Sequence, residues 1–400
     1  MSALSSEIYE AKQGGKSLKG NPLTDEKVKN FDYKYDLWLH SVIDFPTKLK
    51  IKLHEHFPST EEIYRATEKQ LKAFGFLEEE KIAILLKGQR DESFLRIFEC
   101  LEQDNTRFIP WHAPDYPPGL LEMPDHPHGI FVKGKLPCPK RMSIGMVGAR
   151  KCTPYGEHFA LEYSKMLSEV GVQIISGMAR GIDGISHRGA LMGETPTFAV
   201  LGSGVNVCYP KQNQGLYQDI LAKDGGILSE FLPDTEPMAF HFPMRNRIIS
   251  GLSKVLLIME AKERSGSLIT ADMALEQGKD IYALPGPVNS SYSKGCHYLI
   301  KQGAGILISP EELLKDLEVL GGGIYKENCI KKQNCKNNKK IILDNLQNMV
   351  YSLMCFTPKS IHQIAEGIDE PIEGIMNALV SLELEGFIKE VTKNYYVRSS

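Results

Sequence analysis

Short runs of apolar residues alternate with amphipathic stretches through the middle of this chain. Six such runs predict buried strands, and they lie at residues 143–147, 172–176, 197–201, 226–230, 255–259 and 280–284. The stretches between them carry the spacing of helices. Strands that alternate with helices form parallel sheets with crossover helices. The pattern therefore predicts an α/β fold with a Rossmann-like, doubly wound sheet over residues 105–317.

A different pattern precedes this domain. Apolar residues recur at helical spacing from Tyr35 onward, and Ser59 or Thr60 is placed to cap a new helix. We predict an all-helical domain over residues 31–104. The stretch at 110–139 is rich in proline and histidine, which favours extended backbone and turns.

The last sixty residues also form a compact pattern. Thr357 and Pro358 predict the N-cap and first position of a helix, and a second helical face follows them. Residues 387–391 and 395–398 predict the strands of a hairpin. Helix, turn, helix and hairpin together predict a winged-helix domain at 341–400.

Two segments lack such periodicity. Residues 1–30 are rich in Ser, Lys and Gly and predict a disordered leader, whereas residues 318–340 predict a flexible basic linker. Neither an export signal nor a run of the roughly 18 apolar residues of a membrane span is evident. We therefore expect a cytoplasmic protein.

Composition and charge narrow the possible chemistry. The 400 residues carry a formal net charge of −3, so a site for nucleic acid must be a local basic patch. The eight cysteines contain no C-x-x-C pair, which argues against a zinc knuckle or a disulfide framework. We expect no metal, cofactor or catalytic residue.

Glycine-rich turns follow the first two predicted strands. Gly148 and Arg150 lie in a turn that leads into a helix, where backbone amides and a guanidinium can bind phosphate. Ser176 and Gly177 begin a run of small residues that allows close approach to a ligand. The alternative for the first turn is an ordinary strand-to-helix connection with a solvated arginine.

Three further segments add cations, aromatic rings and a helix start. The sequence offers Phe242, Arg245, Asn246 and Arg247 in one run, a pairing of rings and arginines suited to unpaired bases and phosphates. The alternative is that the rings are core and the arginines form salt bridges. Other candidates on the same expected sheet edge are Lys211, Ser265, Gly266 and Lys294.

These motifs together resemble those of the DprA (Smf) DNA-processing family. The resemblance rests on Val-Gly-Ala-Arg at 147–150, Ser-Gly-Met-Ala-Arg-Gly-Ile-Asp at 176–183, Phe-Pro-x-Arg-Asn-Arg-Ile-Ile-Ser-Gly-Leu at 242–252 and Ser-Gly-Ser-Leu-Ile-Thr at 265–270. It implies a sterile-alpha-motif-like helical domain, an extended Rossmann domain and a winged helix. It also implies a homodimer that binds single-stranded DNA during natural transformation and helps to load RecA.

The resemblance also assigns individual residues. Arg150 matches the family's DNA-contacting arginine, the run at 245–247 matches its basic motif, and Lys211 is a further match. The chain departs from the family where Asp44-Phe45-Pro46 replaces a glycine-rich hairpin and where His297 replaces an asparagine. The first departure concerns DNA contact by the helical domain.

Two other functions remain open. A Rossmann-like enzyme that cleaves nucleotide phosphates would need an acid or base such as Glu260 or Asp183, with His187 four residues after the latter. A duplex-binding regulator would act through the winged helix. The second is disfavoured because the candidate recognition helix at 370–385 carries acidic residues but neither Lys nor Arg.

Overall fold

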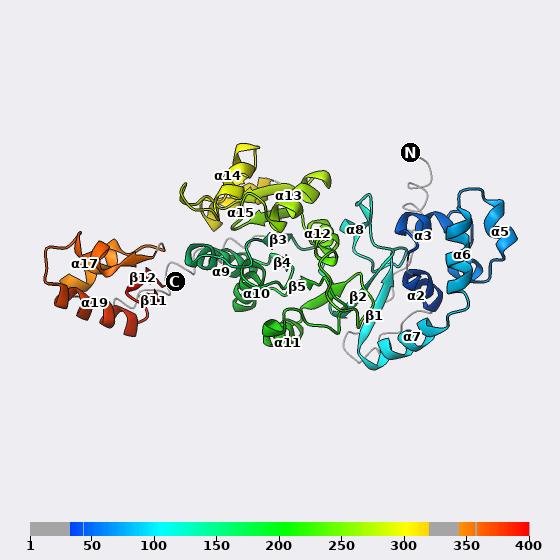
Figure 1. Ribbon diagram of the computed structural model, residues 1–400, viewed down its shortest axis with the longest axis horizontal. Helices are drawn as coiled ribbons and strands as arrows, with labels where there is room; N and C mark the ends of the chain where they lie inside the picture. Colours follow the sequence, from blue (N-terminus) through cyan, green and yellow to red (C-terminus); the bar gives the residue numbers. More distant parts are fainter. Residues whose placement is uncertain (1–32, 43, 320–343, 357, 400) are drawn as a thin grey trace, which may run out of the picture. The chain divides into compact units, whose positions relative to one another are not determined.

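The computed structural model describes residues 33–42, 44–319, 344–356 and 358–399 (Figure 1). The predicted leader lies outside these ranges, and so does the predicted linker apart from its first two residues. The chain divides into residues 1–32 and 33–400, and only the second unit contains described residues.

A nine-stranded mixed sheet forms the centre of the described chain. Its strands are β1 (Thr106–Pro110), β2 (Gly129–Gly134), β3 (Ser143–Val147), β4 (Gln173–Ser176), β5 (Thr197–Val200), β6 (Gly226–Ser229), β7 (Val255–Ile258), β8 (Asp280–Ala283) and β9 (Gly305–Ile306). They lie in the order β1-β2-β6-β5-β4-β3-β7-β8-β9. The six strands predicted from apolar runs are β3 to β8, which confirms the α/β prediction.

In this order, the seven strands from β6 to β9 are parallel to one another, whereas β2 pairs antiparallel with β6 and β1 pairs antiparallel with β2. Strand β3 lies between β4 and β7, so the chain builds outward from it on both sides. In open sheets of this kind, ligands bind beyond the carboxyl ends of the strands at such a switch point.

Helices cover both faces of the sheet. They are α8 (Pro118–Leu121), α9 (Pro154–Glu169), α10 (Ile182–Met192), α11 (Gln214–Ala222), α12 (His241–Leu252), α13 (Gly266–Glu276), α14 (Lys294–Lys301) and α15 (Pro310–Val319), with a 3₁₀ turn, η1, at Lys211–Asn213. Successive strand residues point to opposite faces. Ile175 accordingly packs in the core with α12 and α13, while Ile174 packs with α9 and α15.

Helices dominate the described residues before β1. They are α2 (Lys34–Ser41), α3 (Thr47–Leu53), α4 (Thr60–Tyr64), α5 (Glu68–Ala73), α6 (Glu79–Gly88) and α7 (Ser93–Gln103), around a core that includes Trp38 and Leu53. Ser59 caps α4 by accepting a hydrogen bond from the Glu62 amide, as one of the two predicted alternatives requires. None of the described helices has the length and apolar character needed to span a bilayer.

The last part of the chain contains α17 (Asn345–Leu353), α18 (Ile361–Ala365), α19 (Ile372–Leu384) and a sheet of β10 (Lys359–Ser360), β11 (Ile388–Thr392) and β12 (Tyr395–Arg398). The predicted hairpin is confirmed as β11 and β12. The predicted helix start at Thr357 and Pro358 is wrong, although Thr357 itself is outside the described residues. Helix α18 begins later because Ser360 and Gln363 form a capping box.

Candidate nucleic-acid interface

The turn after β3 packs against the turn after β4, and this contact fixes the position of Arg150. A Cβ atom on Gly148 would lie 2.7 Å from Ile182 Cγ1, and one on Gly181 would collide with the Ala149 carbonyl oxygen. Gly181 also has a φ of 70°, which favours glycine. Small residues therefore bring the two turns together, with the Arg150 side chain exposed at the tip.

Arg245 lies beneath these turns and is only 3% exposed. Its Nη1 atom donates to the Gly177 carbonyl at 2.6 Å and to the Val200 carbonyl, which joins the ends of β4 and β5. Burial lowers the pKa of Arg245 to about 10, and Asp183 opposes this shift. Burial likewise raises the pKa of Asp183, against the influence of Arg245. Arg245 is therefore a positioning residue whose charge is balanced locally.

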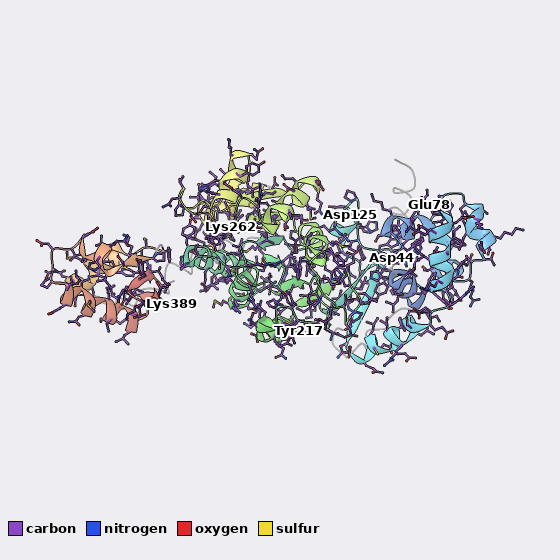
Figure 2. All side chains as sticks on the ribbon, in the orientation of Figure 1. Asp44, Glu78, Asp125, Tyr217, Lys262 and Lys389 are labelled. Carbon is purple, nitrogen blue, oxygen red and sulfur yellow. The ribbon has the colours of Figure 1, made fainter. Side chains whose placement is uncertain are left out.

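Arg247 does not join this group, which corrects the expectation that it lies on the same open edge. It is 8% exposed, pairs with Glu230 and donates to the Asp125 carbonyl at 2.6 Å. Figure 2 labels Asp125, in the segment between α8 and β2. Two residues along a helix differ by about 200° in direction, so Arg245 and Arg247 leave α12 on opposite sides.

An aromatic surface lies beside Arg150. The Arg150 guanidinium carbon lies 5.2 Å from the centroid of the Phe242 ring, and the Tyr209 ring lies 5.7 Å from the same ring. Tyr209 is 45% exposed and Phe242 is half-buried. Phe242 packs over Gly202, where a Cβ atom would approach its Cδ1 atom to 2.9 Å. The arrangement presents a cation and two rings to a ligand.

The start of α13 lines a pocket together with Arg150 and Phe242. Ser265 is the N-cap residue of this helix, and Ser265, Gly266 and Ser267 line the pocket, which has a volume of about 530 Å³. The free amides of a helix start favour an anion here. Lys262 lines the same pocket from the segment after β7, and Figure 2 labels it. Its Nζ atom lies 4.4 Å from the centroid of the Tyr292 ring.

The predicted site residues divide into two groups. Those that line this pocket are Gly148, Arg150, Phe242, Arg245, Asn246, Ser265 and Gly266. An adjoining pocket of about 270 Å³ adds Gly177 and shares Arg150 and Phe242.

The remaining predicted residues lie outside both pockets. Ser176 is buried and donates to the Met146 carbonyl at 2.6 Å, and Lys211 is exposed at the start of η1. Lys294 lines a different cavity with His297 and lies 3.4 Å from a Glu263 carboxylate oxygen.

Four exposed cations lining these pockets were not predicted, namely Lys151, Arg180, Lys262 and Arg264. Lys151 directly follows Arg150, and Arg180 lies inside the glycine-rich run after β4. Their proximity to the motifs was the available signal. It did not identify them because neighbouring residues in a turn differ in direction, which only the folded backbone reveals.

The groups proposed for acid–base chemistry are engaged in the fold. Glu260 accepts hydrogen bonds from the Thr153 amide at 2.9 Å and hydroxyl at 2.5 Å, and it fills the space beside Gly156. His187 Nδ1 lies 2.7 Å from Thr197 Oγ1. Of Glu260, His187 and Asp183, only Asp183 lines the pocket. His187 and Asp183 therefore do not form a pair that faces a ligand.

Comparison with known proteins extends over most of the chain. The model of the DNA recombination-mediator protein A family matches residues 107–318. Protein Smf of Escherichia coli (strain K12) is 39% identical over 300 residues, covering 74% of this chain and 78% of that protein. The DNA processing protein DprA of Streptococcus pneumoniae is 42% identical over 205 residues, covering 51% of this chain and 71% of that protein. Its X-ray structure aligns with a TM-score of 0.60 at 31% identity, covering 70% of this chain and 97% of that one.

Proposed function

Since this chain belongs to the DNA recombination-mediator protein A family, we propose that it binds single-stranded DNA across the carboxyl ends of β3, β4 and β7. The observation that carries the proposal is the position of Arg150, exposed and stacked over Phe242 at the mouth of a pocket. Aromatic faces stack on unpaired bases while guanidinium groups bind phosphates. Neither interaction depends on base identity, so the affinity should depend little on the base sequence of the DNA.

Local charge favours this ligand although the whole chain is acidic. Exposed cations surround the two pockets, namely Arg150, Lys151, Arg180, Lys262 and Arg264. The pocket carboxylate of Asp183 is buried beside Arg245 and so adds little negative potential. A phosphodiester strand can therefore lie along this basic surface despite the net charge of −3.

The predicted residues have three roles in this proposal. Arg150 and the amides of Ser265 and Gly266 bind phosphates, while Phe242 stacks on a base. Arg245 and Gly177 position the turns, and Gly148 allows them to approach. Lys211 and Lys294 remain proposed contacts for flanking nucleotides.

We also propose that the protein acts in the cytoplasm as a homodimer which protects incoming DNA and helps to load RecA, by binding and not by catalysis. Family membership supports this role. The sterile-alpha-motif-like helical domain and the winged helix are part of the same proposal. Mass photometry would count the subunits, and sustained release of base or phosphate from nucleoside monophosphates would contradict the absence of catalysis.

Binding is tested by electrophoretic shift with single-stranded and duplex DNA over a series of salt concentrations. We expect Arg150→Ala with Lys151→Ala to weaken single-strand binding and to reduce its log–log salt slope by about 1.4, since each phosphate contact contributes about 0.7. The matched control is Lys140→Ala with Arg141→Ala, an exposed pair just before β3 instead of just after it. Equal affinities and slopes for the two double variants would show that the site is wrong.

A further inference from the structure

A group of four histidines surrounds one aspartate where the first helices meet β1 and β2. Asp36 and His40 lie on α2, His54 follows α3, His112 follows β1 and His128 precedes β2. The His54 ring lies 5.6 Å from that of His112 and 5.7 Å from that of His128, measured between centroids. His40 lies 5.9 Å from His128. None of the five lines the proposed DNA-binding pockets.

The innermost ring nitrogens of this group have no hydrogen-bond partner among the described residues. His128 is 1% exposed, and both of its nitrogens are buried and unpaired. The Nε2 atom of His54 is also buried and unpaired. An unsatisfied buried polar group costs about 1–3 kcal/mol. A neutral imidazole has one unprotonated nitrogen, so His54 and His128 can each offer one lone pair to a ligand that accepts it, such as a metal ion.

We propose that Asp36, His54 and His128 bind a zinc ion. One ligand atom from each of these residues lies within 4.8 Å of the others. Tetrahedral zinc with bonds of about 2.0–2.2 Å holds its ligands about 3.4 Å apart, so closure needs only small side-chain rotations. Two imidazoles and a carboxylate suit zinc, and the positive ion would offset the buried charge of Asp36.

The neighbours of these ligands orient them. His112 Nε2 lies 2.8 Å from Asp36 Oδ1, and the Thr60 hydroxyl donates to the same oxygen at 2.7 Å. Both bonds use Oδ1, which leaves Oδ2 for the ion. Metal ligands are commonly held by such outer hydrogen bonds. His112 is therefore a positioning residue in this site.

The charges near the cluster are compatible with a cation. Burial lowers the pKa of His54 and His128, which keeps these rings in the neutral form that binds metals. The nearby cation is Lys50, whose ammonium donates to the His40 carbonyl at 2.7 Å and the Val42 carbonyl at 3.1 Å. Burial lowers its pKa to about 8. Main-chain carbonyl oxygens thus hold the Lys50 ammonium, and its lowered pKa makes it easier to deprotonate than an exposed lysine.

The ligands come from segments far apart in the sequence, so the ion would link α2 and the end of α3 to the start of β2. The spacing of the cysteines could not reveal this zinc site, because none of its proposed ligands is a cysteine. The three proposed ligands gave no sequence signal either, since Asp36, His54 and His128 are too far apart in the chain to form a short metal-binding motif. Only the folded chain brings them together.

The test uses the full chain, purified without chelators from medium containing zinc. We expect one zinc per chain by plasma mass spectrometry, and a tetrahedral visible spectrum after replacement by Co²⁺. His54→Gln and His128→Gln should lose the metal, whereas His112→Ala should keep it with an affinity lower by about 10–100-fold. The control is His56→Gln, an exposed histidine two residues after His54.

Several outcomes would overturn the proposal. One is a chain that binds neither zinc nor stoichiometric Co²⁺, which would mean that water alone fills the cluster. Another is a cobalt spectrum with thiolate charge transfer, which would assign the metal to cysteines. A third is equal zinc content in the His128→Gln and His56→Gln variants. If the ligand variants do not fold, the cobalt spectrum of the unaltered chain still decides, and single-strand binding tests the proposed function separately.

Discussion

Gly177 is the residue whose environment most directly couples stability to the proposed DNA site. A Cβ atom there would lie 2.5 Å from both Arg245 Nη2 and Asp183 Oδ2, and both of those side chains are buried. We expect Gly177→Ala to lower the free energy of unfolding by about 1–3 kcal/mol, since buried groups must move. Single-strand affinity should fall as the turn after β4 shifts. Urea unfolding and electrophoretic shift measure the two effects.

Gly266→Ala is the control for this change. It lies in the same pocket, but a Cβ atom there meets nothing within 4 Å. Stability should be unchanged or slightly increased, because alanine favours a helix more than glycine does. If Gly177→Ala were as harmless as Gly266→Ala, the packing of Arg245 against Asp183 would not limit the site.

At the scale of elements, helix α12 performs two separate tasks with two arginines. Arg245 faces the pocket turns, and Arg247 pairs with Glu230 on the other side of the helix. We expect Arg247→Ala to destabilise the protein by about 3–5 kcal/mol, because it leaves the Glu230 carboxylate buried without its partner. The salt slope of single-strand binding should stay unchanged in the protein that remains folded. Thermal unfolding and salt-dependent shifts separate these effects.

Replacing both partners provides the control. Arg247→Ala with Glu230→Ala removes the buried charge as well, so it should recover part of the lost stability. The structural role would be contradicted if the single Arg247→Ala variant kept full stability while its salt slope fell by about 0.7, the contribution of one phosphate contact. Arg247 would then be a DNA-contacting residue.

The elements were predictable where burial dictates sequence. Strands β3 to β8 are covered on both faces, so they appear as continuous apolar runs. Strands β1 and β2 were missed because β1 ends where the proline-rich stretch begins, at Pro110 on the edge of the sheet, and β2 lies inside that stretch. Strand β9 has only two residues and leaves no pattern.

The site was predictable to the level of turns and not of side chains. The sequence placed the segments of Arg150 and Phe242 at one expected edge of the sheet, and their side-chain contact is seen only in the folded chain. Motif spacing could not distinguish Arg245 from Arg247, because the partner of Arg247 is Glu230, which is distant in sequence. Side-chain direction on a helix and a remote carboxylate decide that outcome, and both require the folded chain.

At the scale of the whole molecule, every residue that lines the two pockets lies between 147 and 292. Those residues belong to one sheet and its helices, so single-strand binding should not require the part of the chain after α15. We expect a chain ending at residue 319 to keep the single-strand affinity and salt slope of the full chain. The comparison uses the same electrophoretic shifts, with circular dichroism to confirm that the shortened chain is folded.

The acidic character of the C-terminal helix supports this expectation. The surface of α19 offers no Lys or Arg to a phosphate, and it includes Glu373 and Glu383. Deleting α19 should therefore remove no positive charge that attracts the phosphates of single-stranded DNA. A large loss of affinity in the folded, shortened chain would mean that residues after 319, including the lysines of the 320–343 segment, complete the DNA-binding surface. Substituting those lysines in the full chain would then reproduce the loss.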